Sequence, residues 1–500
     1  MFATEPENGM LLRLDSALAT PLYRQICEQL AAWIEDGTLR PGDRLPATRD
    51  LATSTGVHRA TVVRAYEELH ALGYSDSRSG AYTTVRRRAR SPATVHTAPN
   101  LRPPPWLGRV DPRAKRVLDR GLLSSDPPLP AGGIDFARLQ ADPDLAPCAD
   151  LRRCIRSAIA RAGSAAFDYA EPAGVRSLRE AIAQRLRMHG IATCVDEILI
   201  TSGAQQALDL ALRLLVRPGD HVVVEAPTYG VAHALLRLHG ALPIEVPMTP
   251  RGLDLEVLER VLARSRPKLV YTMPSFQNPT GLTLGQTQRE RLLTLCERAR
   301  VPIVEDGFEE EMKYFGRPVL PLKSMDARGQ VLYVGTFSKV VFPGLRVGWL
   351  VAPREAITLL SAMQYAANLA VNTVAQCAAE RFCRGGELDA YLRRVHRVYR
   401  QRMVALLDGL ERYMPEGVEW TRPVGGYALW LTLPAKSGRE SLWLQRLGAA
   451  GLRLAPGSRF FARAPQRVHF RLSIACVDEA RIQTGCRRLG RVLSNGKLRA

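Results

Sequence analysis

Five short apolar stretches constrain the fold of this 500-residue chain more than any other feature. Each is four or five residues long and rich in β-branched residues, which is typical of strands buried on both faces of a sheet. A helical pattern over residues 204–215 follows the first of them. Short strands that alternate with amphipathic helices predict a largely parallel sheet covered by helices on both faces. We therefore expect an α/β domain over residues 134–490, with strands at residues 197–201, 221–225, 268–271, 301–305 and 331–334.

Polar residues that suit one kind of ligand follow these strands. Parallel strands end at a common edge, where the ligands of such sheets bind. Residues 202–206, Ser-Gly-Ala-Gln-Gln, precede a helix whose N-terminus offers free N–H groups to a phosphate. Asp306 ends a buried strand, where its carboxylate needs a cationic partner. Lys339 follows another strand, and a desolvated lysine of lowered pKa can form a Schiff base with an aldehyde.

Four further residues complete the set of groups that would bind this ligand. Tyr229 offers a flat ring, and Asn278, in Asn-Pro-Thr-Gly, offers an amide donor on a rigid turn. Ser338 and Arg346 offer a hydroxyl and a guanidinium for a dianion. A phosphate, a planar ring with a protonatable nitrogen, a phenolic oxygen and an aldehyde together define pyridoxal 5′-phosphate (PLP). Singly, each motif is explained as a helix start, a turn, a cap or a loop lysine, but their common place at strand ends favours the cofactor.

The segment GTFSKVVFPGLRVGWLVAP, residues 335–353, is highly specific and makes the domain similar to fold-type I aminotransferases. By that resemblance, Lys339 is the catalytic lysine that forms the internal aldimine with PLP, and Asp306 pairs with the pyridine nitrogen. Asn278 bonds the ring oxygen, and Tyr229 stacks on the ring. The residues that would hold the phosphate are Ala204, Gln205, Ser338 and Arg346.

Two positions outside these motifs are also assigned by the resemblance. Residues 468–474 alternate between apolar and other residues, which predicts a strand with Arg471 on the face opposite its apolar side chains. Arg471 matches the arginine that clamps the substrate carboxylate in aminotransferases, a bidentate pairing that lysine cannot copy. A solvated strand charge is the alternative. Tyr169 matches a residue that reaches across a dimer, and we interpret His469 as structural.

Residues 1–85 carry a different pattern, in which apolar residues recur at helical spacing. They predict a first helix over residues 22–34, a short second helix over residues 49–55 and a third over residues 58–72. A glycine-containing turn separates the second helix from the third, which is the helix-turn-helix pattern. Residues 77–85 predict a β-hairpin wing. A small three-helix packing domain is the alternative.

Residues 21–74 resemble the GntR-type winged helix-turn-helix of bacterial regulators almost from end to end. In such a module the first residues of the last helix enter the major groove, where arginine contacts guanine or phosphate. Operator DNA is therefore the expected partner. The candidate contacts are Arg49, His58, Arg59, Thr61, Arg64 and the wing at Gly80. His58 stands where serine is usual and the wing lacks one expected glycine, so the resemblance does not define the operator.

The net charge of +20 is unevenly distributed along the chain. Residues 1–85 hold 8 basic and 11 acidic residues, whereas residues 86–120 hold 10 basic and 2 acidic ones. Residues 86–130 also contain nine prolines, which favour extended conformations. We expect a basic, Pro-rich, semi-rigid linker over residues 86–133, which is either a solvated spacer or a contact for DNA phosphates.

Composition excludes several other classes of protein. No apolar run approaches the roughly 20 residues that a membrane span needs. The first ten residues lack the apolar core of a signal peptide. Nine cysteines are scattered without CxxC pairs, which fits reduced thiols in a cytoplasm better than disulfides or zinc. We expect a cytoplasmic protein with no metal site and no membrane partner.

The fusion of the two parts resembles the MocR subfamily of GntR regulators, to which GABA-responsive, taurine-responsive and pyridoxine-synthesis regulators belong. The resemblance covers nearly the whole chain. It implies a head-to-tail homodimer and a PLP-dependent transcriptional regulator that senses an amino acid, an amine or PLP itself at Lys339. Phe308 departs from the family, because tyrosine usually stands there and its hydroxyl bonds the ring oxygen of the cofactor. We therefore expect aldimine exchange or half-transamination rather than full turnover.

Three alternatives to an amino-compound sensor remain open. The chain would be a working aminotransferase with a vestigial head if it turned over an amino donor and a keto acid. It would be a sensor of PLP itself if the cofactor alone changed operator binding. The head would bind a protein if DNA affinity did not depend on Arg59. The sequence determines neither the effector nor the operator, nor whether the outcome is activation or repression.

Overall fold

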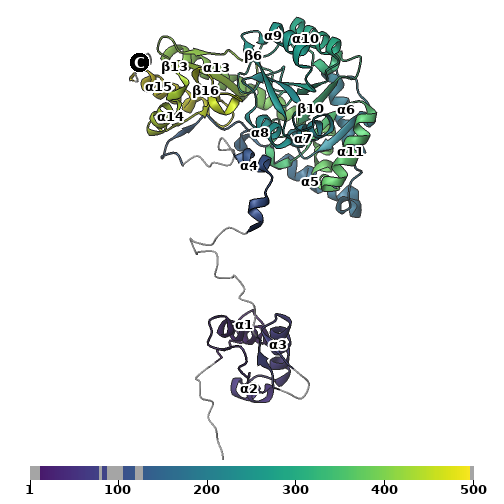
Figure 1. The fold of residues 1–500 in the computed structure, drawn as a ribbon, viewed down its shortest axis with the longest axis vertical. Helices are drawn as coiled ribbons and strands as arrows, with labels where there is room; N and C mark the ends of the chain where they lie inside the picture. Colours follow the sequence, from purple (N-terminus) through teal and green to yellow (C-terminus); the bar gives the residue numbers. More distant parts are fainter. Residues whose placement is uncertain (1–11, 78–81, 87–104, 119–127, 496–500) are drawn as a thin grey trace, which may run out of the picture. The chain divides into compact units, whose positions relative to one another are not determined.

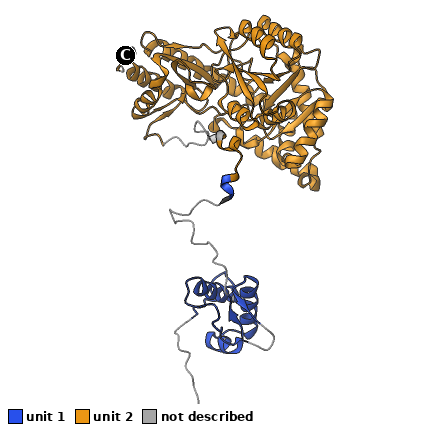
Figure 2. Ribbon diagram, viewed as in Figure 1, with its two compact units in different colours: residues 1–108 blue, residues 109–500 orange. Residues whose placement is uncertain are grey.

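The computed structural model describes residues 12–77, 82–86, 105–118 and 128–495, which form two compact units. Unit 1 comprises residues 1–108 and unit 2 residues 109–500 (Figure 2). Within the described part of the chain, no helix is long and apolar enough to cross a bilayer. The same residues contain no cluster of three histidine, cysteine or acidic side chains that would suit a metal ion.

Unit 1 contains three helices and a short hairpin, as the helical spacing predicts. Its elements are α1 (Leu22–Glu35), α2 (Thr48–Thr55), α3 (Arg59–Ala71), β1 (Ser75–Asp76) and β2 (Thr84–Val85), the last two antiparallel. Ile26, Val62 and Leu69 are fully buried between the helices. Gly56 ends α2 with a left-handed φ of +68°, a conformation that glycine adopts without steric cost. The winged helix-turn-helix is confirmed, although the tip of the wing, with Gly80, lies outside the described residues.

Part of the stretch expected to be an extended linker is helical. Two elements lie there, the 3₁₀ turn η2 (Pro105–Arg109) and the helix α4 (Pro112–Leu118). Pro112 stands at the start of α4, where a missing N–H costs no hydrogen bond. Helix α4 packs against α8 (Gly230–His239) and so belongs to unit 2. Proline content therefore did not by itself imply an extended chain here.

The centre of unit 2 is an eight-stranded sheet in the order β4-β11-β10-β9-β8-β5-β6-β7 (Figure 1). Its strands are β4 (Ile198–Thr201), β5 (His221–Ala226), β6 (Leu242–Thr249), β7 (Gly252–Leu253), β8 (Leu269–Thr272), β9 (Ile303–Asp306), β10 (Val331–Thr336) and β11 (Gly348–Val351). The five predicted strands are all present and mutually parallel. Strand β11 was not predicted; it runs antiparallel to both neighbours because the loop from β10 is too short for a parallel crossover.

Helices cover both faces of this sheet, as predicted. On β5, Val222 and Val224 pack on one face, against α7 (Ala204–Leu215) and α8, while Val223 packs on the other. The first face also carries α11 (Arg354–Asn368), and the second carries α9 (Leu255–Ser265) and α10 (Gln286–Ala299). The strands are therefore apolar at successive positions rather than at every second one.

A smaller antiparallel sheet lies in the C-terminal part of unit 2. It contains β12 (Glu419–Trp420), β13 (Ala428–Lys436), β16 (Arg467–Ser473) and β15 (Ala455–Pro456). The remaining helices of unit 2 are α5 (Cys148–Ala162), α6 (Arg176–Met188), α12 (Thr373–Arg384), α13 (Glu387–Tyr413), α14 (Glu440–Ala449) and α15 (Glu479–Asn495). Strand β3 (Ile134–Asp135) pairs in parallel with β14 (Leu452–Arg453). This pairing brings the segment after β3 next to β16 and to the edge of the large sheet.

Candidate functional site

One cavity of about 160 Å³ collects all eight residues predicted to hold the cofactor. It lies at the carboxyl ends of the parallel strands, because each of these residues follows a strand. The cavity is also lined by Met273, Thr336 and Phe308. Phe308 is buried there and carries no hydroxyl group for a ring oxygen.

Asp306 is buried at the end of β9 and is only half satisfied. Its Oδ2 accepts a hydrogen bond of 2.8 Å from the hydroxyl of Tyr271, whereas its Oδ1 has no partner among the described residues. Burial raises the pKa of Asp306 to about 6, and the bond from Tyr271 opposes this. An unpartnered buried carboxylate oxygen fits a cationic N–H group. Tyr271, which orients the carboxylate, was not identified from the sequence because it lies inside an apolar strand.

The N-terminus of α7 and Arg346 form the cationic end of the same cavity. Gly203 caps the helix with a φ of +97°, and a Cβ there would lie 3.1 Å from the guanidinium of Arg346. Arg346 donates a hydrogen bond to the carbonyl of Ser202, and the hydroxyl of Thr336 donates to that of Ser338 at 3.1 Å. A helix N-terminus, a guanidinium and hydroxyl groups are the donors that a phosphate dianion requires.

Lys339 points into the cavity beside a buried acid that the sequence analysis missed. Its Nζ donates to the carbonyl of Leu139, and its own carbonyl accepts from the hydroxyl of Tyr427 at 2.7 Å. Burial lowers the pKa of Lys339, while the negative charge of Glu309 raises it. Glu309 is fully buried; its Oε2 accepts from the backbone N–H of Tyr427 at 3.0 Å, and its Oε1 has no partner in the described chain. The sequence signal that could have identified Glu309 is its position three residues after Asp306, at the end of the same strand.

Arg471 is buried on β16, so the alternative of a solvated strand charge is wrong. It is 8% exposed, and its guanidinium donates to Asn278 Oδ1 at 3.0 Å and to the carbonyl of Ala137 at 2.6 Å. Its Nε has no partner in the part of the chain that the structure describes. Because Asn278 Oδ1 accepts from Arg471, the amide nitrogen of Asn278 is the group left to donate to a ring oxygen. His469, on the same strand, stacks on Trp430 with ring centroids 5.2 Å apart.

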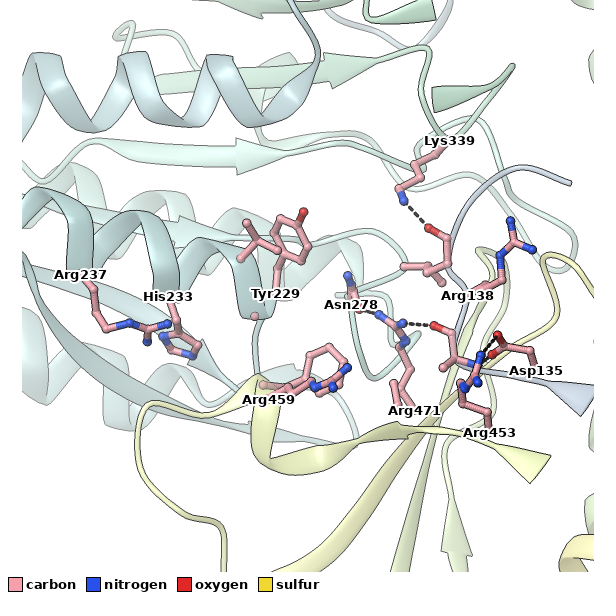
Figure 3. A pocket seen from close by; sticks show the side chains of 16 residues that line it. Asp135, Arg138, Tyr229, His233, Arg237, Asn278, Lys339, Arg453, Arg459 and Arg471 are labelled. Atoms are coloured by element: carbon pink, nitrogen blue, oxygen red, sulfur yellow. Dashed lines mark hydrogen bonds and ion pairs between the residues drawn. The ribbon is translucent and has the colours of Figure 1, made fainter. Parts of the chain in front are cut away.

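A second cavity of about 550 Å³, here called the outer chamber, adjoins the first and shares Tyr229, Asn278 and Lys339 with it. Figure 3 shows the side chains of Lys339 and Arg471 on opposite sides of this space, each pointing into it. Segment 135–139 forms one wall, and its carbonyls at Ala137 and Leu139 accept the hydrogen bonds from Arg471 and Lys339. Tyr169 lines neither cavity; its side chain is 72% exposed.

The predicted DNA contacts lie on α2 and α3 of unit 1. Arg49, His58, Arg59 and Arg64 are exposed, whereas Thr61 is half-buried. His58 is the N-cap of α3, since its Nδ1 accepts from the N–H of Ala60 at 3.2 Å. Arg64 lies over the ring of Tyr23, 4.0 Å from its centroid, whereas the Nε of Arg59 makes a bond of 3.4 Å to the hydroxyl of Thr48.

Comparison with known families gives one match for each unit. The family described as aminotransferase class I and II matches residues 141–489, and the bacterial regulatory proteins of the gntR family match residues 22–85. The uncharacterized HTH-type transcriptional regulator YdcR of Escherichia coli is 33% identical over 478 residues, covering 94% of this chain and 98% of that protein.

Relatives without a regulator name match unit 2. Aromatic-amino-acid aminotransferase 1 of Thermococcus litoralis is 36% identical and covers 76% of this chain and 90% of its own length. The crystal structure of LysN, an alpha-aminoadipate aminotransferase of Thermus thermophilus complexed with N-(5′-phosphopyridoxyl)-L-leucine, superposes with a TM-score of 0.71 at 33% identity. The match covers 78% of this chain and 98% of that structure.

Proposed function

The chain belongs to the class I and II aminotransferases and to the gntR family of bacterial regulators, fused as in MocR-type regulators, and we propose that a small amino compound, sensed at PLP on Lys339, controls its binding to DNA. The observation that carries this proposal is one cavity that holds all eight predicted cofactor residues and a buried carboxylate oxygen with no partner among the described residues, in one chain with a DNA-binding unit. A relative aligned over 94% of the chain is named as a regulator.

The residues of the smaller cavity fit PLP by their donor chemistry. Asp306 Oδ1 would accept a hydrogen bond from the protonated pyridine nitrogen, and that cationic partner would favour the ionised carboxylate. The amide of Asn278 would donate to the ring oxygen, and Tyr229 would cover the ring. The phosphate would take the N–H groups at the start of α7 together with Ser338 and Arg346. When bound, PLP supplies an aldehyde and an electron-withdrawing ring for an amino group.

The cofactor and the acid group of the amino compound would replace two backbone carbonyls as partners of Lys339 and Arg471. Arg471 donates to the carbonyl of Ala137, and Lys339 donates to that of Leu139. PLP bound to Lys339 would already have removed the bond to Leu139, and a ligand acid group at Arg471 would remove the bond to Ala137, so segment 135–139 would then have lost both. Ligand binding and release of this segment are therefore linked. The effector would favour the state in which segment 135–139 is released over the state in which it is held.

The signal would pass to DNA in a head-to-tail homodimer. In this arrangement Tyr169, whose ring is exposed, would contact the partner subunit's cavity. A change in segment 135–139 would then alter how the two DNA-binding units engage an operator. A ligand that binds both states equally would not change the equilibrium between them.

A working aminotransferase is the second candidate function, because relatives such as aromatic-amino-acid aminotransferase 1 carry that name. Phe308 disfavours it, since no hydroxyl from that position reaches the cavity. Direct sensing of PLP, without an amino compound, is distinguished by titrating the cofactor alone against DNA binding. Steady turnover of an amino donor with a keto acid would favour the enzyme.

The test is the substitution Lys339→Ala, followed by cofactor absorption and by fluorescence anisotropy on operator DNA selected from a random library. We expect the variant to lose the visible absorption of bound PLP and any response of DNA affinity to amino compounds. Lys268→Ala, at an exposed lysine outside both cavities, is the matched control. Survival of both signals in Lys339→Ala would contradict the proposal.

A further inference from the structure

Glu309 is a fully buried acid that the proposed function does not use. It follows Asp306, at the end of β9, by three residues. Its Oε2 accepts a hydrogen bond of 3.0 Å from the backbone N–H of Tyr427, whereas its Oε1 has no hydrogen-bond partner among the described residues. A buried carboxylate oxygen without such a partner is costly. The ionised group is therefore stable only if nearby cations balance its charge.

Tyr427 connects this acid to Lys339. The backbone N–H of Tyr427 donates to Glu309, and its hydroxyl donates to the carbonyl of Lys339 at 2.7 Å. Gly426 leaves room for the carboxylate, because a Cβ at that position would lie 2.6 Å from Oε2 of Glu309. Tyr427 is itself fully buried, so packing fixes both of its bonds. One buried residue thus holds Glu309 and Lys339 close to each other.

The charge of Glu309 acts on two buried cations. Burial lowers the pKa of Lys339, and Glu309 is the charged group that raises it most. Burial also lowers the pKa of Arg471 to about 10, and Glu309 is again the charged group that opposes this most. In the described part of the chain, neither oxygen of Glu309 bonds to these cations. Glu309 therefore acts on them through its electric field rather than through a hydrogen bond.

The other titratable groups that act on Lys339 or Glu309 do not supply this charge. Three of them are neutral at physiological pH, because burial raises their pKa values: Cys476, Tyr314 and Tyr427. Asp306 also acts on Lys339, but its Oδ1 is the candidate partner of the pyridine nitrogen. Arg471 is the candidate partner of a ligand acid group. Glu309 is then the acid that remains for the amine of Lys339.

We infer that Glu309 is a positioning residue for Lys339, whose amine it holds as an ammonium ion whenever that amine is free. The amine is free before the cofactor binds and again after an amino compound has replaced it there. A stabilised ammonium ion favours the second of these states, so Glu309 would favour binding of the amino compound. This last step rests on the proposed function, whereas the charge on Lys339 is tested in the cofactor-free protein.

The test measures the proton affinity of Lys339 by labelling with acetic anhydride, which reacts with amines only in their uncharged form. Lys339 lines the outer chamber, where a small reagent reaches it, and the exposed Lys268 is the internal reference. Glu309→Gln removes the charge but keeps an oxygen that accepts from the N–H of Tyr427. The pH at half-labelling of Lys339, followed by mass spectrometry, should fall by about one unit or more in this variant.

Two further variants separate charge from structure. Glu309→Asp keeps the charge and should hold the pH at half-labelling within about half a unit of that of the original protein. Glu310→Gln, at the adjacent half-buried position, is the matched control and should leave it unchanged. A role for Glu309 in packing alone would leave the value the same in Glu309→Gln, because the bond from Tyr427 is kept.

A second measurement needs no substitution at Glu309. The coupling between two charges is reciprocal, so Lys339→Ala should make Glu309 hold its proton to a higher pH. The infrared absorption of protonated carboxyl groups at about pH 8 should therefore be larger in cofactor-free Lys339→Ala than in the original protein.

Three results would overturn the inference: no fall in Glu309→Gln, an equal fall in either of the other two variants, or no change in carboxyl absorption when Lys339 is removed. The proposed function fails in a different way. In that case the labelling of Lys339 would shift as expected, but amino compounds would not change DNA affinity.

Discussion

Arg59 of unit 1 and Arg471 of unit 2 carry the same guanidinium in opposite environments. Arg59 is exposed at the start of α3 and makes one long bond to a neighbouring hydroxyl. Arg471 is 8% exposed and shares a chamber with four other arginines. An exposed guanidinium attracts a polyanion through water, where salt screens it. A buried guanidinium has already lost its bound water. It therefore binds ligands that supply hydrogen bonds in place of that water much more tightly than ligands that do not.

Salt concentration tests this comparison most directly and should give the largest effect. Raising salt from about 50 to about 200 mM should weaken DNA binding by about 10³-fold, because phosphate contacts release counterions. The same change should weaken binding of an amino acid at Arg471 by less than about tenfold, because buried charges are poorly screened. Anisotropy and cofactor absorption measure the two affinities in the same buffers. Equal slopes for both ligands would break the comparison.

Removal of the buried guanidinium should give the next largest effect. Arg471→Gln should lower amino acid affinity by about 100-fold, since the ligand carboxylate then loses its charge-assisted partner inside the protein. DNA affinity without an amino acid should stay unchanged. Arg467→Gln, on the same strand but paired with the exposed Glu419, is the control and should have little effect. A loss below about threefold in Arg471→Gln would argue against the clamp.

Two exposed arginines of α3 should differ in their effect on DNA binding. Arg59→Ala should lower DNA affinity by about tenfold and reduce the salt slope by about one. Arg64→Ala should cost less, about threefold, because Tyr23 already engages its guanidinium. Anisotropy on one operator fragment measures both. If Arg64→Ala had the larger effect, Arg64 would have to leave Tyr23 in the complex.

Buried charge on the acidic side of the site gives the smallest effect, seen as a dependence of stability on pH. Burial raises the pKa of Glu309 to about 7, so the folded cofactor-free protein holds this proton more tightly than the unfolded chain does. The stability that this group contributes is therefore full below about pH 4 and is lost as the pH rises through about 7.

Glu309→Gln should remove this loss. We expect the cofactor-free variant to be about 1 kcal/mol more stable than the original protein at pH 8 and nearly equal to it at pH 5. Urea unfolding at the two pH values measures the difference. Glu310→Gln, at the adjacent half-buried position, is the control. An equal shift at both pH values would mean that packing, not charge, causes it.

The sequence predicted the elements whose pattern is local. The three helices of unit 1, helix α7 and the five parallel strands were found because apolar spacing marks each one over a few residues. Strand β6 was missed since it contains Pro243 and Pro247, and proline argues against a strand inside a sheet. Helix α4 was missed because the prolines around it favoured an extended chain.

In the site, the sequence by itself determined which residue types stand at the strand ends, because side chains that follow a strand are visible as a motif. The tertiary structure alone decided what they meet. The backbone carbonyl of Leu139 accepts a hydrogen bond from Lys339, 200 residues away, and that of Ala137 accepts one from Arg471, 334 residues away. Backbone carbonyls are common to all residues and so leave no signal in the sequence.

The cationic outer chamber is likewise a product of the tertiary structure. Its arginines come from α8, from the segments after β3 and β15, and from β14 and β16. In the sequence they are five among the 69 basic residues, with no common spacing. Their meeting depends on β3 pairing with β14 and on the turn at Phe460 packing against α8, contacts that local periodicity does not encode.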